Sequence, residues 1–310
     1  MPDAVGDRCD VRPWDGEFVR YPPRWHTVLL PKPPSRATAT GMILYTAARP
    51  LPVVAQQLLW LAARATNGRT ARGASTHWPS PLSDAAMAEL WTRLAEIAGR
   101  PADGMAVYER LQSERRGAPT FLFCAGPRSL LVRVRETPDA LNVEQRIGTV
   151  FAARPAAGFT VPALAGSGEL DGWHWTAHEA ISSRPHRPVR RVRATLFDQI
   201  SDLVERAIPR PDAVPAHWRG AHGDVTAWNL RSTGRRTWLI DWEDAGYAPP
   251  GADFVYFEAI RAAVGRSRSR ATGDEYAEAR AYWREIISRR SVAPTERKLA
   301  ARLRAALDEA

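Results

Sequence analysis

The sequence is poor in cysteine and has no long apolar run, and both features exclude classes of protein. Cys9 and Cys124 lie far apart in 310 residues and form no CxxC spacing. A disulfide framework or zinc site is therefore not expected, and a reducing compartment is favoured. The first residues have no basic start followed by an apolar stretch, so no signal peptide is expected. We predict a cytoplasmic protein without a transmembrane segment.

No nucleic-acid-binding module accompanies the positive charge of the chain. The formal net charge is +9, with a pI near 10.2, but most of the excess is arginine scattered along expected helices. The one dense cluster is the short segment 266–270. Basic surface alone does not specify nucleic-acid recognition, so no specific nucleic-acid partner is expected.

Residues 1–102 are expected to form an N-terminal extension of unknown role. Its start, with prolines between Pro22 and Pro34, predicts irregular structure. Apolar residues at 51–64 predict a helix that is shorter than the ~20 residues of a membrane span. Packing on the rest of the protein and contact with a membrane surface are the two interpretations of this helix. Ser83 is a candidate cap for a second helix, reaching about residue 98.

The pattern changes to short strands from Met105 onward. Strands are expected at 107–111, 120–124, 129–134, 159–164 and 173–178, with a helix at 140–153 after the third strand. This order predicts a small antiparallel sheet with one helix laid against it. After Pro188 the chain is mainly helical, with helices expected at 189–208, 253–264, 274–289 and 295–308.

Three oxygen-bearing side chains follow one another at two expected loops. His222-Gly223-Asp224 is followed five positions later by Asn229, and Asp241 ends the strand-like run 238–240. Carboxylate and amide oxygens in this grouping suit Mg²⁺ bound to a nucleoside triphosphate and a hydroxyl oriented toward its terminal phosphate. The sequence therefore predicts phosphoryl transfer.

The motifs HGDxxxxN at 222–229 and LIDW at 239–242 resemble the aminoglycoside phosphotransferase and choline kinase superfamily, small-molecule kinases with a protein-kinase-like fold. The resemblance covers about residue 105 to the C-terminus. It implies an α+β bilobal fold: a nucleotide-binding N-lobe at 103–182 with a small antiparallel sheet, and a mainly helical C-lobe at 183–310 that carries the catalytic and metal-binding loops.

The resemblance also implies roles for the motif residues. Asp224 is expected to be the catalytic base, and Asn229 and Asp241 are expected to bind Mg²⁺. His222 is expected to brace the loop by packing or hydrogen bonding rather than to transfer protons. Asp253, at a helix start, is expected to stabilise the catalytic hairpin.

The expected phosphate-binding half departs from the family pattern. Strand alternation places Leu131 and Arg133 on one face, and Arg133 occupies the position where the family carries lysine. Glu144, one turn into the next helix, is its expected partner. Only Gly117 serves the phosphate-covering loop 113–117. By position, Glu179 and Ala180 are expected to contact adenine through their backbone.

We therefore expect a small-molecule kinase, a transferase that uses ATP and Mg²⁺ to phosphorylate a hydroxyl of a small polar acceptor. The alternative is a nucleotide-binding pseudokinase or scaffold, motivated by Arg133 and the glycine-poor loop. Arginines of the C-terminal helices favour a neutral or anionic, sugar-like acceptor over a polycationic one. The pocket can still draw on the carboxylates Glu243, Asp244, Glu258 and Glu275.

Two further pairs of residues beside the motifs are open to two interpretations each. Glu243 and Asp244 either add negative potential near the acceptor hydroxyl or cap the turn that leads to Gly246. Trp228 and Trp242 either wedge the two loops together or form an aromatic wall for the substrate.

Overall fold

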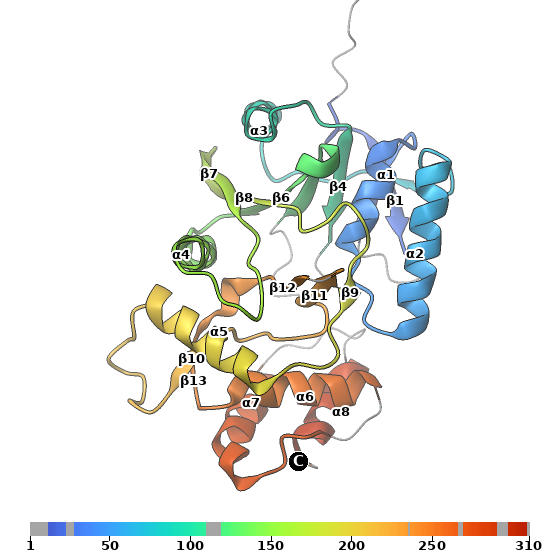
Figure 1. Cartoon of the computed structure of the whole chain (residues 1–310). Coiled ribbons are helices and arrows are strands. Elements are labelled where there is room, and N and C mark those ends of the chain that lie inside the picture. Colours follow the sequence, from blue (N-terminus) through green and yellow to red (C-terminus); the bar gives the residue numbers. More distant parts are fainter. Residues whose placement is uncertain are drawn as a thin grey trace, which may run out of the picture.

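The computed structural model describes residues 12–22, 28–109, 119–234, 236–265, 269–289 and 297–308. Figure 1 shows a lobe that contains the large sheet, and below it a lobe made mainly of helices. This is the expected bilobal α+β arrangement. Within the described residues no helix is both long enough and apolar enough to cross a membrane.

The upper lobe is built on one antiparallel sheet. Its strands lie in the order β3-β1-β2-β4-β5-β6-β8-β7. They are β1 (Glu17–Tyr21), β2 (Val28–Lys32), β3 (Ser75–Thr76), β4 (Gly104–Tyr108), β5 (Thr120–Cys124), β6 (Leu130–Arg135), β7 (Leu164–Leu170) and β8 (Trp173–Glu179). The expected strands at 120–124, 129–134 and 173–178 are confirmed. The expected strand 107–111 begins earlier, at Gly104, and ends at Tyr108; residues 110 and 111 lie outside the described residues.

The strand expected at 159–164 is wrong, because β7 begins only at Leu164. The strand β7 was not predicted because Gly166 and Gly168 make its sequence resemble a turn. In the structure a Cβ at Gly168 would lie 3.0 Å from the Trp175 indole, and one at Gly166 would lie 2.6 Å from Ile97. The glycines allow close approach of the strand to its neighbours.

The expectation of irregular structure in the proline-rich start is wrong for β1 and β2, which pair with each other, while β2 also pairs with β4. Pro33 and Pro34 do lie outside the strands, and residues 23–27 lie outside the described residues. Pro31 is tolerated within β2 because the pairing with β4 involves only Val28 and Leu29. Proline lacks the N–H that a strand with neighbours on both sides needs. The pairing therefore crosses the expected boundary between residues 102 and 103.

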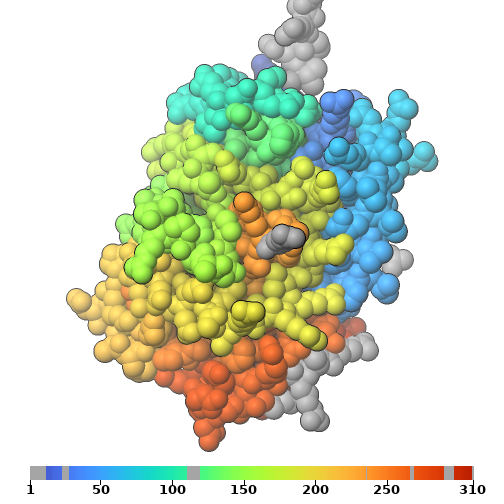
Figure 2. Space-filling model, viewed as in Figure 1, coloured from blue at the N-terminus to red at the C-terminus, as the bar shows by residue number. Residues whose placement is uncertain are grey.

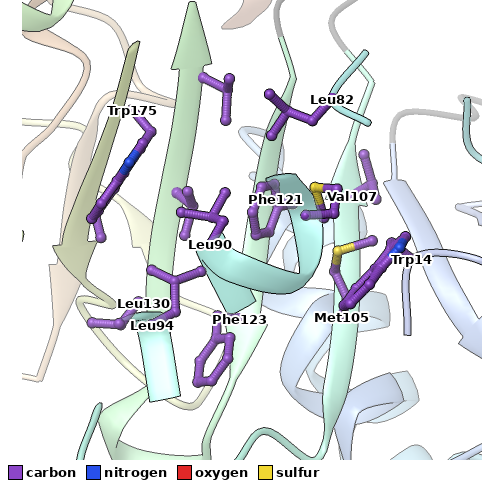
Figure 3. Close-up of a cluster of buried hydrophobic side chains, with 14 of the residues drawn as sticks. Trp14, Leu82, Leu90, Leu94, Met105, Val107, Phe121, Phe123, Leu130 and Trp175 are labelled. Carbon is purple, nitrogen blue, oxygen red and sulfur yellow. The ribbon is translucent and has the colours of Figure 1, made fainter. Parts of the chain in front are cut away.

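Three helices of the first hundred residues flank this sheet: α1 (Arg36–Gly41), α2 (Pro50–Ala65) and α3 (Asp84–Ala98). As expected, Ser83 caps α3, where its hydroxyl accepts from Ala86 N at 3.3 Å. Leu90 and Leu94 of α3 pack against Phe121 and Leu130 in the core shown in Figure 3. The helix α3 therefore covers one face of the central strands, and the candidate site lies on the opposite face.

The helix α4 (Asp139–Ala153) follows β6, and the rest of the chain forms the lower lobe. Its helices are α5 (Ala194–Ala207), α6 (Ala252–Gly265), α7 (Ala277–Arg289) and α8 (Arg297–Asp308), and its short strands are β9 (Arg187–Pro188), β10 (Arg219–Ala221), β11 (Leu230–Thr233), β12 (Arg236–Leu239) and β13 (Gly246–Ala248). The helix expected at 189–208 starts five residues late, because Arg193 is still extended (φ −83°, ψ 146°).

Candidate active site

Arg133 on β6 is buried and held by carboxylates from both lobes. Its guanidinium donates to Glu144 of α4 and lies 2.9 Å from Asp241 Oδ1 of the lower lobe. Burial opposes the charge, but Glu144, Asp241 and Glu243 outweigh it and raise the pKa of Arg133 above its usual value. The expected partnership of Arg133 and Glu144 is thus present, and Arg133 also bridges to the expected metal ligand.

A second arginine, two residues further along β6, makes a parallel link. Arg135 Nη2 lies 3.3 Å from Glu243 Oε2, and both side chains are largely buried. The two arginines are two residues apart, and so are the two carboxylates. The two ion pairs therefore lie side by side, Arg133 with Asp241 and Arg135 with Glu243. Neither interpretation of Glu243 included this bridge between the lobes. Arg135 was not among the predicted site residues.

Asp224 and Asn229 are joined directly. The Asn229 amide nitrogen donates to the Asp224 carboxylate at 2.8 Å and to the Asp224 backbone oxygen at 3.0 Å. The backbone also links the two loops, because Ile240 N donates to Asn229 O at 3.1 Å. Asp241 follows at once, in a left-handed conformation with φ 71°, which aspartate tolerates better than most residues.

His222 has the contacts of a bracing residue. Its Nε2 donates to Ile240 O at 3.1 Å and its Nδ1 accepts from Asp224 N at 3.2 Å. Burial lowers the pKa of His222 to about 4, so the ring is neutral at physiological pH and can play both parts at once. The side chain therefore ties the Asp224 loop to the Asp241 strand, as expected.

Asp253 in the first turn of α6 holds the backbone just before Asp224. Its two carboxylate oxygens accept from His222 N at 2.7 Å and from Gly223 N at 3.1 Å. Burial raises the pKa of Asp253 to about 6, although both N–H groups oppose the rise. Only glycine fits at position 223, because its φ is +80° and a Cβ there would lie 2.4 Å from Asp244 O. The expected stabilising role of Asp253 agrees with these contacts.

A cavity of about 360 Å³ lies between the lobes at these residues. Its lining includes the expected catalytic, nucleotide-binding and metal-binding residues, namely Arg133, Glu144, Glu179, Ala180, Asp224, Asn229 and Asp241. Trp228 and Trp242 line it as well. The fold therefore gathers the predicted residues around one space.

Several buried polar atoms around this cavity have no hydrogen-bond partner within the described part of the chain. They include Thr120 Oγ1, Glu144 Oε2 and His178 Nε2, each on a residue that lines the cavity. Burial and the Arg133 charge lower the pKa of His178 to about 4, so its 3.9 Å approach to Glu144 is not an ion pair. Unsatisfied buried polar atoms are costly in a folded protein, and these three lie on residues at the wall of the cavity.

The donor set for a metal is small. No group of three or more His, Cys, Asp or Glu among the described residues is arranged to hold an ion. Asn229 and Asp241 line the same cavity, and each side chain would supply one oxygen to a metal there. This fits Mg²⁺, which proteins usually hold through one or two side-chain oxygens together with substrate phosphates and water.

The expected adenine contacts face a constraint. Glu179 N donates to Ala163 O and Ala180 N donates to Ser129 O, both at 2.9 Å. These two N–H groups are already engaged. A base contact at this position stays a prediction, and it would use the carbonyl groups or the following residues.

Residues 43–46, which we call the pocket wall, line the cavity and were missed by the sequence analysis. Three of them, Ile43, Leu44 and Tyr45, pack in one hydrophobic cluster with Tyr108, Leu122 and Ala180. The buried Gln56 of α2 donates to Met42 O at 3.0 Å and to Tyr45 O at 2.6 Å. The wall has no motif, and its one signal in the sequence is a glutamine within an apolar helix.

The far side of the wall is anchored to the lower lobe by Arg231 of β11. This fully buried side chain donates to Ala47 O at 3.2 Å and to Ala227 O at 2.8 Å, and it also bonds His186. Burial lowers the pKa of Arg231 to about 9. The N-terminal region therefore contributes one side of the cavity and is fixed to both lobes.

Other expectations concern residues around the acceptor. The phosphate-covering loop 113–117 and Arg266 and Arg268 lie outside the described residues. Glu258 is fully buried and accepts from Arg261 and Arg270. Together with the Arg135–Glu243 contact, this neutralises two of the four carboxylates considered for the acceptor.

Comparison with known proteins places this geometry in a family. No curated protein matches the chain. Solved structures with similar folds include a thermostable mutant of aminoglycoside phosphotransferase APH(4)-Ia (15% identity, 70% of this chain and 89% of that chain, TM-score 0.39). A putative fructosamine-3-kinase from Haemophilus somnus 129PT has 7% identity over 71% and 95% of the two chains, with TM-score 0.43. Residues 47–294 match the model of the phosphotransferase enzyme family, and the chain therefore belongs to that family.

Proposed function

We propose that the protein is a small-molecule kinase that transfers the terminal phosphate of ATP to a hydroxyl group of a small polar molecule. The observation that carries this proposal is the grouping of Asp224, Asn229 and Asp241 around one cavity that also contains Arg133. In phosphoryl transfer the protein mainly positions the reactants and stabilises charge, and this grouping contains the side chains for both tasks.

Asp224 is the proposed general base. Its carboxylate accepts a hydrogen bond from Asn229 at 2.8 Å, which fixes the orientation of the oxygens. In the reaction it would accept the proton of the attacking hydroxyl and hold that oxygen in line with the phosphate. General-base assistance of this kind typically contributes about 10²- to 10⁴-fold to the rate.

Asn229 and Asp241 are the proposed Mg²⁺ ligands, and the metal would neutralise charge on the phosphates. Arg133 is the proposed phosphate-binding cation. It presents a planar, permanently charged group that binds phosphate through two parallel hydrogen bonds. Because Arg133 already contacts Asp241 at 2.9 Å, it lies next to the position proposed for the metal and the phosphates.

A neutral or anionic, sugar-like hydroxyl compound is the proposed acceptor. A polycationic acceptor requires uncompensated carboxylates, whereas Glu258 and Glu243 are each bound by arginine. The cytoplasm, with its supply of ATP, is the proposed location.

A mutation at Asp224 tests the proposed reaction. Purified protein with Mg²⁺ and ATP is screened against sugars, amino alcohols and aminoglycosides, with ADP release as the measurement. Asp224→Asn should lower turnover by at least about 100-fold while ATP still binds. Asp212→Asn, at an exposed loop position, is the matched control. Full turnover by Asp224→Asn would refute the proposal.

The pseudokinase alternative rests on one specific contact. Arg133 stands where the resemblance places a lysine, and it pairs with the expected metal ligand Asp241. If this pair persists when nucleotide binds, the protein would bind ATP without Mg²⁺ dependence and no acceptor would be phosphorylated. Calorimetric titration with ATP, with and without Mg²⁺, distinguishes the two functions.

A further inference from the structure

The exposed large hydrophobic side chains of the described residues all lie on one helix, α2. They are Leu51 (81% exposed), Val54 (56%), Leu58 (61%), Leu59 (43%) and Leu61 (54%). Single exposed apolar residues are common on proteins, but a contiguous group of them marks an interaction site. In Figure 2 this helix forms part of the blue margin on the right of the molecule.

The helical periodicity places these residues on one continuous surface. Leu51, Val54, Leu58 and Leu61 follow the spacing i, i+3, i+7, i+10, which is one stripe of an α-helix. The opposite side of α2 is already used, because Val53, Gln56, Trp60 and Ala63 are buried against the protein. A helix that is apolar on both sides is usually buried on both sides. The described residues cover α2 on one side only.

The charged residues nearest to this stripe along the chain are all positive. Arg49 precedes α2, Arg64 lies in its last turn, and Arg69 and Arg72 follow it; all four are exposed. From residue 33 to residue 83 the sequence contains no aspartate or glutamate. The α2 surface, meaning the apolar stripe with these four arginines, therefore combines exposed leucines with basic charge of one sign.

We propose that the α2 surface binds the headgroup region of an anionic lipid bilayer. Leucines that enter the interface between headgroups and acyl chains gain from burial, and arginines beside them gain from the negative surface potential. A second copy of the chain is the less favourable occupant, because pairing two α2 surfaces would bring like charges together. The proposal rests on this surface alone and is independent of the proposed phosphotransferase activity.

Vesicle sedimentation tests the proposal with the full chain. Vesicles of phosphatidylcholine alone, or of phosphatidylcholine mixed with phosphatidylglycerol, are incubated with the protein and pelleted. Wild type should pellet with the mixed vesicles only, and less so at high salt, where surface charges are screened.

Substitutions identify the surface that binds. Leu58→Ser should weaken partitioning about tenfold or more, because it removes one buried leucine from the lipid contact. Arg64→Gln should weaken it about fivefold. Arg154→Gln, at the exposed position that ends α4, is the control and should bind as wild type does. Figure 1 shows α4 and α2 on opposite sides of the molecule. Circular dichroism confirms that each variant is folded.

Three results would overturn the proposal. One is equal binding to both kinds of vesicle, because the arginines would then contribute nothing. Another is binding that Leu58→Ser leaves unchanged. The third is an absence of lipid binding together with concentration-dependent self-association that Leu58→Ser abolishes, measured by sedimentation velocity; a second copy would then be the occupant.

Discussion

The link between Arg133 and Glu144 allows a sharp test, because both charges are buried. Arg133 is 6% exposed, as is Glu144, and Asp241 lies on the other side of the guanidinium. Arg133→Met keeps much of the apolar stem and removes the charge. Glu144 would then remain buried without its cation.

The expected loss of stability is large. Breaking a buried ion pair by removing one partner typically costs about 3–5 kcal/mol, because the other charge remains uncompensated. Glu144→Gln in the same background removes that charge as well. The double variant should therefore recover about 2–3 kcal/mol relative to the sum of the single variants, which is the coupling expected for residues in one network.

The stability lost in Arg133→Met should also depend on pH. Burial raises the pKa of Glu144 above its usual value, and Arg133 opposes that rise. Without Arg133 the pKa is higher still. A carboxyl whose pKa is raised in the folded state takes up its proton there before the unfolded chain does, so falling pH favours the folded state. Arg133→Met should therefore be less destabilising at pH 6 than at pH 8.

Urea unfolding, followed by tryptophan fluorescence at both pH values, measures these differences. Arg133→Lys is the matched control, since it keeps a positive charge at the same strand position. The reasoning is refuted if the two single substitutions are additive to within about 0.5 kcal/mol, or if the cost of Arg133→Met is the same at pH 6 and pH 8.

Three further substitutions test other parts of the site. Gly223→Ala should cost more than Gly172→Ala, because both positions have positive φ but only at Gly223 would a Cβ collide, at 2.4 Å from Asp244 O; thermal unfolding compares the two. The difference in unfolding free energy between wild type and His222→Asn should shrink by about 2 kcal/mol from pH 6.5 to pH 5. The buried ring, with pKa about 4, stays neutral in the folded wild type, whereas the unfolded chain accepts a proton there, so only wild type loses stability over this range. Equal pH profiles of the two proteins would contradict this. Gln56→Leu should weaken ATP binding more than it lowers turnover at saturating ATP, since it releases the pocket wall; unchanged affinity in calorimetry would remove the wall from the ATP-binding site.

Local patterns predicted much of the strand and motif placement. Alternation along 129–134 placed Arg133 and Leu131 on the same face, because successive side chains of a strand point to opposite faces, and both residues line the cavity. The family resemblance, together with the position of Glu144 one turn into the next helix, predicted the pairing of Glu144 with Arg133. Both predictions involve residues fewer than a dozen positions apart in the chain, and the local backbone geometry constrains such pairs.

Long-range contacts left no such pattern. Arg135 and Glu243 are 108 positions apart, and nothing in either neighbourhood distinguishes them from exposed charges. Proline in β2 indicated a break, yet Pro31 lies beyond the residues that pair with β4. Where proline sits relative to the neighbouring strands decides its effect, and that relation depends on the assembled sheet.

The pocket wall shows why the catalytic side of the site was easier to predict than the wall side. Under the proposed function, Asp224, Asn229 and Asp241 must carry oxygen-bearing side chains at set spacings, because phosphoryl transfer needs a general base and metal ligands. The wall at 43–46 requires only apolar bulk, which many residues supply, and it precedes the family match that begins at residue 47. What holds it is polar: Gln56 and Arg231 are buried, and each must find backbone acceptors. Buried polar side chains that no motif explains are therefore the places in a sequence where such a wall can be sought.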